Sequence, residues 1–159
     1  MKIYFASDHA GFELKVHLIE FVSALGYATE DCGPRAIDTD DDYPDFVIPM
    51  AKKVAAESDG MGIIVGASGQ GEAMAANRVQ GIRAAVYYGP AAENQTDANG
   101  NVLNLIASTR AHNNANVLSI GARFVAGEDV EKAVRLWLST PFSGDERHMR
   151  RNAKIDASR

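Results

Sequence analysis

Short apolar runs of strand character alternate along this chain with segments whose apolar residues recur at helical spacing. Residues 2–7 (KIYFAS) and 61–68 (MGIIVGAS) are runs of the first kind, and residues 11–26 form a segment of the second kind. Strands that alternate with helices pair in parallel through right-handed crossovers. The pattern therefore predicts an α/β protein, a doubly wound (Rossmann-like) three-layer sandwich with a five-stranded parallel sheet.

The remaining elements follow from the same periodicity. Further strands are expected over residues 27–33, 82–88 and 116–122, and helices from Pro44 towards Ser58 and over 72–78, 104–112, 130–140 and 143–157. Gly26 stands where a glycine ends a helix, and Pro44 suits the first turn of the next one. At 159 residues the chain has the usual size of one domain, so we expect residues 1–159 to form a single domain.

Residues 89–105 do not fit this alternation. Polar and turn-forming residues crowd together there, between an expected strand and an expected helix. Loops of this length without structure are uncommon in compact domains and tend to be mobile or functional. We expect an extended, mobile surface loop.

Composition excludes several classes of function. The net charge of −5 opposes nonspecific binding to nucleic acid or to an anionic membrane, so an anionic ligand needs a local cluster of positive groups. No apolar run approaches the roughly 20 residues that span a bilayer. The chain enters a strand without a basic, apolar leader, and the single Cys32 allows no internal disulfide. We therefore expect a soluble, cytoplasmic protein.

Polar residues gather at the ends of the expected strands. In parallel α/β sheets, ligands bind outside the carboxyl ends of the strands. The residues that follow an expected strand, or precede one in the case of His112 and Asn113, are Ser7, Asp8, His9, Ser68, Gly69, Gln70, Gly71, Glu72, His112, Asn113 and Arg123. As a set, they indicate a binding or catalytic site.

Each of these residues also has a purely structural explanation. Asp8 suits the N-cap of the first helix, and His9 and His112 are compatible with ordinary hydrogen-bonded histidines. The glycines of the turn suit backbone angles closed to other residues. Glu72 in the first turn of a helix is stabilised by the helix dipole without any chemistry.

The glycine-rich turn GASGQGE, residues 66–72, ends on a negative charge. It lacks the Gly-Lys-Ser/Thr ending of a phosphate-binding loop and the three-glycine spacing of a dinucleotide site. The carboxylate of Glu72 would also repel a pyrophosphate seated on the helix N-terminus. A base beside an uncharged carbon centre resolves the conflict, because the backbone N–H groups of the turn can stabilise an oxyanion formed by proton removal.

The C-terminal segment carries a cluster of positive charge. Arg147 and Arg151 are four residues apart and share one face of a helix, whereas Arg150 falls on another side. A solvated basic face is the ordinary explanation. Guanidinium groups also suit bidentate capture of phosphate, and a protein of net negative charge must concentrate its cations to hold an anion.

Taken together, the motifs resemble the ribose-5-phosphate isomerase B family, which also contains the galactose-6-phosphate isomerase subunits. The resemblance is carried by SDHAGFELK at 7–15, DCG at 31–33, DDDYPDF at 40–46, GASGQGEAMAANR at 66–78, HNNANVLSIGAR at 112–123 and PFSGDERHMRR at 141–151. It extends over nearly the whole chain and fails only within residues 89–105. The resemblance implies an aldose–ketose isomerase that interconverts ribose 5-phosphate and ribulose 5-phosphate through an enediolate, without metal or organic cofactor.

The resemblance also implies a base. Some family members use a cysteine just after the third strand, where this chain has Gly66. The other type closes the glycine turn with a glutamate, which matches Glu72. Cys32 lies in a different motif and receives no role. A carboxylate shielded from water has a raised pKa, which suits a group that takes a proton and returns it.

Further roles are implied by the same resemblance. His112 is the acid that opens the sugar ring, with Asp8 as its helper. Ser68 and the backbone of Gly69, Gln70 and Gly71 hold the enediolate. Asn113 contacts substrate hydroxyls, and Tyr43 lines the pocket. His9 and Arg123 bind phosphate together with Arg147 and Arg151 of the other subunit, in a homodimer or tetramer with shared sites.

Two alternatives remain open from the residues. One is an isomerase of the same family that acts on another sugar phosphate, such as a tetrulose or hexose phosphate, because residues 89–105 lead towards His112. The other is a nucleotide-binding module without turnover, which Glu72 and the missing phosphate-loop lysine disfavour.

Overall fold

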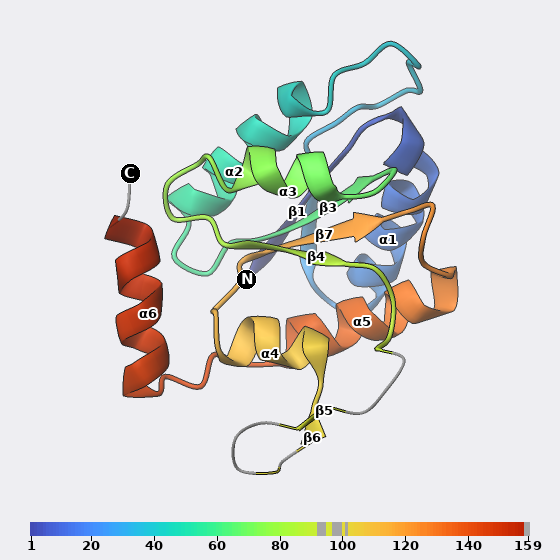
Figure 1. Ribbon diagram of the computed structural model, residues 1–159. Coiled ribbons are helices and arrows are strands. Elements are labelled where there is room, and N and C mark those ends of the chain that lie inside the picture. Colours follow the sequence, from blue (N-terminus) through green and yellow to red (C-terminus); the bar gives the residue numbers. More distant parts are fainter. Residues whose placement is uncertain (92–94, 97–99, 101, 158–159) are drawn as a thin grey trace.

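A five-stranded, wholly parallel sheet forms the centre of the protein (Figure 1). The computed structural model describes residues 1–91, 95–96, 100 and 102–157. The strands are β1 (Lys2–Ser7), β2 (Ala28–Asp31), β3 (Met61–Gly66), β4 (Ala84–Tyr87) and β7 (Val117–Gly121), in the order β2-β1-β3-β7-β4. The predicted doubly wound α/β fold is confirmed.

Helices cover both faces of the sheet (Figure 1). The short 3-10 helix η1 (His9–Gly11) leads into α1 (Phe12–Ala24), which lies with α4 (Leu105–Ala111) and α5 (Gly127–Ser139) on one face. Helices α2 (Pro44–Ala56) and α3 (Gln70–Ala76) cover the other face. Among the described residues, no helix has the length and apolar character needed to cross a bilayer.

Strand β3 shows why its sequence is an unbroken apolar run. Ile63 and Val65 pack into the core beneath α1 and α5, around Trp137. Ile64 points the other way, into the core beneath α2, beside Met50. Because side chains alternate between faces and both faces are covered by helices, every position of this central strand is buried.

The expected ends of the helices are close to those observed. Gly26 has φ +90° and its N–H donates to the carbonyl of Ser23 at 2.9 Å, so it ends α1 as predicted. Helix α2 begins at Pro44, also as predicted. Helix α5 begins at Gly127, earlier than expected, with Glu128 and Asp129 in its first turn. Acidic residues there favour a helix start, a signal that the apolar periodicity missed.

The segment 89–105 contains structure that the sequence did not indicate. Strands β5 (Gln95–Thr96) and β6 (Val102–Leu103) pair in an antiparallel ribbon. Residues 92–94, 97–99 and 101 lie outside the described residues. The expected mobility of this segment therefore stays a prediction.

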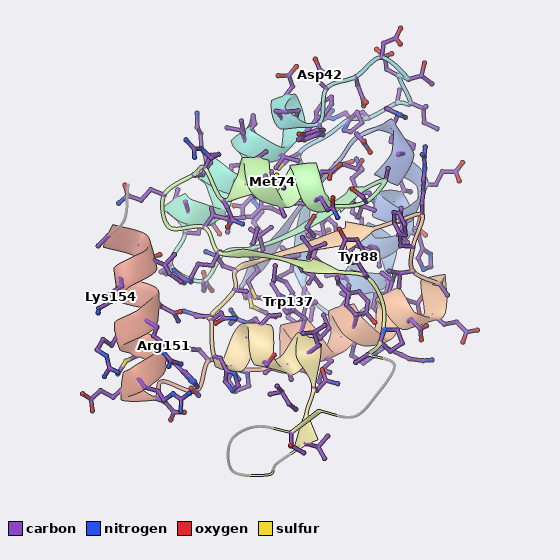
Figure 2. All side chains as sticks on the ribbon, viewed as in Figure 1. Asp42, Met74, Tyr88, Trp137, Arg151 and Lys154 are labelled. Carbon is purple, nitrogen blue, oxygen red and sulfur yellow. The ribbon has the colours of Figure 1, made fainter. Side chains whose placement is uncertain are left out.

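Helix α6 (Glu146–Ala157) stands beside the sheet and covers neither of its faces (Figure 1). Asp156 forms an ion pair with Arg83 at 3.0 Å, and the amide of Asn152 donates to the carbonyl of His112 at 3.3 Å. Met149 and Ile155 are exposed large apolar side chains on this helix. In Figure 2, Arg151 and Lys154 lie on it at the edge of the molecule.

Gly11 lets η1 approach strand β3 closely. A Cβ added to Gly11 would lie 2.0 Å from the carbonyl oxygen of Val65, which is backbone and has no room to move. The backbone angles of Gly11 are ordinary (φ −97°), so the requirement for glycine is steric. This contact fixes the residues after β1 against the end of β3.

Gly11→Ala is therefore expected to destabilise the fold by about 3 kcal/mol or more, because the new methyl group overlaps backbone atoms. Gly127→Ala is the matched control. Nothing lies within 4 Å of an added Cβ at Gly127, the first residue of α5, so this change should be neutral or slightly stabilising. Urea unfolding of both variants measures the difference. Equal midpoints for the two would mean that η1 does not depend on this close approach.

Candidate active site

Three neighbouring strands end together at one edge of the sheet. Ser7 of β1 pairs with Val65 of β3, and Gly66 of β3 pairs with Gly121 of β7. We call this side, where the strands end, the carboxyl edge. It lies opposite α6 in Figure 1. The residues that follow these strands are brought together there, as the sequence predicted: Asp8, His9, Ser68, Gly69, Gln70, Gly71, Glu72 and Arg123.

The glycine turn after β3 is held by the neighbouring strand. Gly69 has φ +75°, a left-handed conformation that favours glycine. The Ser119 hydroxyl donates to the carbonyl of Gly69 at 2.7 Å, and the N–H of Gln70 donates to the Ser68 hydroxyl at 3.3 Å. The turn is thus fixed from β7 before helix α3 begins, which leaves its backbone amides in a defined position.

Glu72 is a buried carboxylate in the first turn of α3. Only 4% of the residue is exposed. Burial raises the pKa of its carboxyl group above the ordinary value, and the negative charge of Asp8 raises it further, while its own backbone N–H opposes the shift. A carboxylate shielded in this way is a stronger base than one in water, which is the property that proton abstraction from carbon requires.

Gly66 makes the space that Glu72 occupies. A Cβ added to Gly66 would lie 1.8 Å from Oε1 of Glu72, so any side chain at this position would displace the carboxylate. The resemblance implies a base either at position 66 or at position 72. The structure gives a steric reason for this choice, because a side chain at position 66 would overlap the Glu72 carboxylate. Cys32 directly follows β2 and is half-buried, and burial raises the pKa of its thiol.

Asp8 fulfils the structural role considered from sequence. Its Oδ1 accepts the N–H of Gly11 at 3.0 Å and so caps η1. Asp8 is also close enough to Glu72 for its charge to affect that carboxyl group. Capping and a part in the site are therefore compatible.

Tyr43 lies against the glycine turn. A Cβ added to Gly71 would lie 2.6 Å from the Tyr43 hydroxyl oxygen. Tyr43 directly precedes α2, so the segment between β2 and α2 reaches over the carboxyl edge. The structure thus brings Tyr43 to the predicted site.

His9 and Arg123 bring positive charge to the same edge. Arg123 is exposed after β7 and its charge acts on His9. Nδ1 of His9 lies 2.6 Å from Oδ1 of Asp41. In the sequence, Asp41 belongs to the motif DDDYPDF at 40–46 and carries no predicted role. Only the folded chain, which joins residues 32 positions apart, identifies it.

Four predicted site residues lie elsewhere. His112 and Asn113 precede β7 and so lie at the amino edge of the sheet, next to α6, which carries Arg147 and Arg151 (Figures 1 and 2). Within one chain, His112 thus lies at the opposite end of the sheet from Asp8, and the expected help of Asp8 to His112 stays a prediction. A parallel strand separates the residues before it from those after it by its full length.

The amino-edge residues form a cluster of their own. The His112 and His148 rings stack with centroids 4.4 Å apart and an angle of 36°. His148 is buried, and burial lowers its pKa, as does the neighbouring His112. His148 lies between Arg147 and Arg151 in the sequence, where no pattern indicated its contact with His112.

A cavity of about 830 Å³ opens at the same edge, between residues 77–85 and α6. Asn113, Ile155 and Asp156 are among the residues that line it. The amino edge thus offers a concave surface, and the buried carboxylate of Glu72 lies elsewhere. Within the described residues, no cluster of three or more His, Cys, Asp or Glu side chains has a geometry that would hold a metal ion.

Known proteins resemble this chain over nearly its whole length. The model of the Ribose/Galactose Isomerase family matches residues 3–155. Ribose-5-phosphate isomerase B of Mycobacterium tuberculosis is 37% identical over 151 residues, 95% of this chain and 85% of that protein. The probable ribose-5-phosphate isomerase B of Mycoplasma genitalium is 38% identical over 154 residues, 96% of this chain and 92% of that protein.

Solved structures of the same kind of enzyme are also similar to this chain. The crystal structure of ribose-5-phosphate isomerase B from Mycoplasma genitalium with bound ribulose-5-phosphate superposes with a TM-score of 0.84 at 37% identity, and covers 98% of this chain and 93% of that one. The enzyme from Clostridium thermocellum gives a TM-score of 0.84 at 36% identity, with 98% and 95% covered. The chain belongs to the Ribose/Galactose Isomerase family.

Proposed function

We propose that this protein interconverts ribose 5-phosphate and ribulose 5-phosphate, with Glu72 as the base. The observation that carries the proposal is the buried Glu72 carboxylate, which fills the space left by Gly66 beside the glycine turn. The substrate is inferred from the relatives named above, one of which is described with bound ribulose-5-phosphate. Phosphorylated sugars are charged and are retained inside cells, so a cytoplasmic location fits this reaction.

The reaction needs one base that acts on one face of the open-chain sugar. Glu72 removes the proton from C2 of the aldose, and the electron pair of the broken C–H bond forms the C1=C2 double bond of an enediolate, with negative charge on the C1 oxygen. A proton passes from the hydroxyl group on C2 to the C1 oxygen, and the same carboxyl group returns its proton to C1, which gives the ketose. The Ser68 hydroxyl and the backbone N–H groups of the turn stabilise the charged oxygen of the enediolate, as an oxyanion hole does.

We infer that the complete site is shared between two chains. The carboxyl edge of one chain holds Glu72, Asp8 and the cations His9 and Arg123, whereas His112 and Asn113 lie at the amino edge. In a dimer that brings unlike edges together, His112 of the partner subunit would open the sugar ring beside Asp8 and Glu72. Asn113 of the partner subunit would bind hydroxyl groups, while Tyr43 lines the pocket.

The phosphate supports the same arrangement. A protein of net charge −5 needs several cations to hold a dianion, and the carboxyl edge offers His9 and Arg123. Arg147 and Arg151 are exposed on α6, where Met149 and Ile155 present uncovered apolar surface. A partner chain that covers these apolar side chains would bring its own phosphate site to Arg147 and Arg151. Binding of the remote phosphate then positions the reacting carbons.

The activity itself is tested by kinetics on a panel of sugar phosphates with four, five and six carbons. We expect the highest kcat/KM for ribose 5-phosphate, without added metal. A higher value for a tetrulose or hexose phosphate would keep the reaction type and change the substrate. No turnover of any sugar phosphate would overturn the proposal.

Loss of the base should abolish turnover while substrate still binds. Glu72→Gln is expected to lower kcat at least a few hundredfold, the range for a lost general base, with little change in the affinity for ribose 5-phosphate. Cys32→Ser is the control and should retain near-normal kcat, since this thiol lies outside the site. Near-normal turnover by Glu72→Gln would remove Glu72 from the mechanism.

The space at Gly66 can be tested separately from the carboxylate. Gly66→Ala should displace the Glu72 side chain and lower kcat by a similar factor, while the protein still folds, because the overlapping atoms are the end of a flexible side chain. Adding Gly66→Ala to Glu72→Gln should cost little further activity, because both changes act on the same group. A strictly multiplicative loss in the double variant would mean that Gly66 acts by another route.

Mixed dimers test the shared site. Glu72→Gln and Arg147→Ala homodimers should each be nearly inactive, but in a mixed dimer one site carries both changes and the other carries neither. If random pairing gives mixed dimers as half of the population, about a quarter of wild-type activity should return on co-refolding.

Co-refolding of Glu72→Gln with Ser68→Ala is the matched control. Both residues lie at the carboxyl edge of one chain, so neither site of that mixed dimer is intact and no activity should return. Absence of recovery with Arg147→Ala, when mass spectrometry demonstrates mixed dimers, would sink the shared-site arrangement.

A further inference from the structure

The segment between β2 and α2 brings a second buried carboxylate to the carboxyl edge. The start of this segment is held in place by the buried Lys15, which forms an ion pair with Asp31 at 2.7 Å and donates to the carbonyl of Pro34 at 2.6 Å. The segment ends at Tyr43, beside the glycine turn. Asp41 lies near its end, with only 5% of its side chain exposed.

Asp41 uses one oxygen atom to hold His9 at two points. Its Oδ1 lies 2.6 Å from Nδ1 of the imidazole ring and accepts the backbone N–H of His9 at 3.2 Å. The two contacts fix both the main chain and the ring of His9. Because Nδ1 is engaged, Nε2 is the ring nitrogen left for a ligand, and 31% of the His9 side chain remains exposed.

The negative charge of Asp41 depends on His9 for compensation, because the other carboxylate oxygen has no partner in the part of the chain that the structure describes. Oδ2 is buried and has no hydrogen-bond partner among the described residues. A buried carboxylate without compensation is costly, and a proton on the imidazole supplies the missing positive charge. The protonated ring then donates from both nitrogens.

The charges around His9 come from three elements. Asp41 precedes α2, Asp8 caps η1, and Arg123 follows β7. The hydrogen bond with Asp41 raises the pKa of His9, and the charges of Asp8 and Asp41 add to this, whereas burial and Arg123 oppose it. The sum favours the imidazolium form above the pH at which a free histidine loses its proton.

We propose that Asp41 is a positioning residue that favours the protonated form of His9 and keeps its ring turned with Nε2–H outward, as a charged donor to the substrate phosphate. The inference rests on the proposed function, in which His9 binds phosphate. Asp41 does not touch the substrate and acts only through His9. The acidic segment before α2 thus serves an anion site, because it extends the pH range over which the ring carries a positive charge.

Phosphate binding by His9 should depend on pH in a definite direction. His9 contributes to phosphate binding below its pKa and loses that contribution as pH rises through it. Because Asp41 raises this pKa, it extends phosphate binding to higher pH. Removal of the negative charge should therefore weaken binding most at alkaline pH and least at acid pH.

The test compares Asp41→Asn with Asp40→Asn, a neighbouring, exposed carboxylate with the same change of charge. At pH 8 we expect Asp41→Asn to raise KM for ribose 5-phosphate roughly tenfold while kcat falls less than about threefold, as for a lost charge-assisted hydrogen bond. At pH 6 the difference in KM should shrink to about twofold or less. Asp40→Asn should match the wild type. A KM effect of equal size at every pH, or one shared by Asp40→Asn, would overturn the inference.

A double variant separates a local effect on His9 from general damage. His9→Gln removes the phosphate donor, so His9→Gln with Asp41→Asn should have the same KM as His9→Gln alone. A further loss in the double variant would mean that Asp41 supports the fold or the substrate in another way, and would overturn the inference. Thermal unfolding of each variant identifies any that fails to fold.

NMR titration keeps the inference testable apart from the activity. The chain has four histidines, and the His9 ring signals are assigned by their loss in His9→Gln. The His9 midpoint should move to lower pH in Asp41→Asn, and inorganic phosphate should shift the His9 signals in the wild type at pH 8. If the wild type fails to turn over ribose 5-phosphate, the proposed function fails, yet this titration still decides the role of Asp41. Equal His9 midpoints in the two proteins would overturn it.

Discussion

The absence of a side chain at Gly66 allows a carboxylate to be buried at the end of the central strand. An added Cβ would overlap the Glu72 carboxylate, so the strand must end on glycine for this carboxylate to lie where it does. The turn that follows is fixed from β7 through Ser119, and η1 is fixed against β3 through Gly11. Each of these contacts occurs at a glycine, where a side chain would prevent the close approach. These glycines therefore allow the residues of the carboxyl edge to gather.

The direction of the strands explains why one chain holds only part of the proposed site. Residues after a parallel strand and residues before it lie at opposite edges of the sheet, however close they are in sequence. His112 precedes β7 and Arg123 follows it, so the strand itself separates the two. A site shared between two chains, as proposed, suits this geometry, because a second copy can bring an amino edge to a carboxyl edge and the same chain cannot.

The sequence was informative wherever a local pattern carries the information. Apolar periodicity predicted the sheet and its helices, Gly26 and Pro44 predicted helix ends, and the motifs predicted the family. It failed where distance along the chain matters. The contact of Asp41 with His9 and the stacking of His148 on His112 are tertiary contacts without a periodic signal. The ribbon of β5 and β6 is local, but its two-residue strands are too short to give a periodic signal.

Two buried carboxylates at one edge of the sheet show how environment divides the work between like residues. Glu72 has burial and the negative charge of Asp8 around it, which favours a proton on the carboxyl group and so strengthens it as a base. Asp41 faces an imidazole instead, and the proton is favoured on the ring. The first arrangement suits a group that must exchange a proton with carbon. The second suits a group whose charge must persist while an anion binds and leaves. An acidic protein can therefore bind an anion at this edge, because one of its buried acids acts through a histidine.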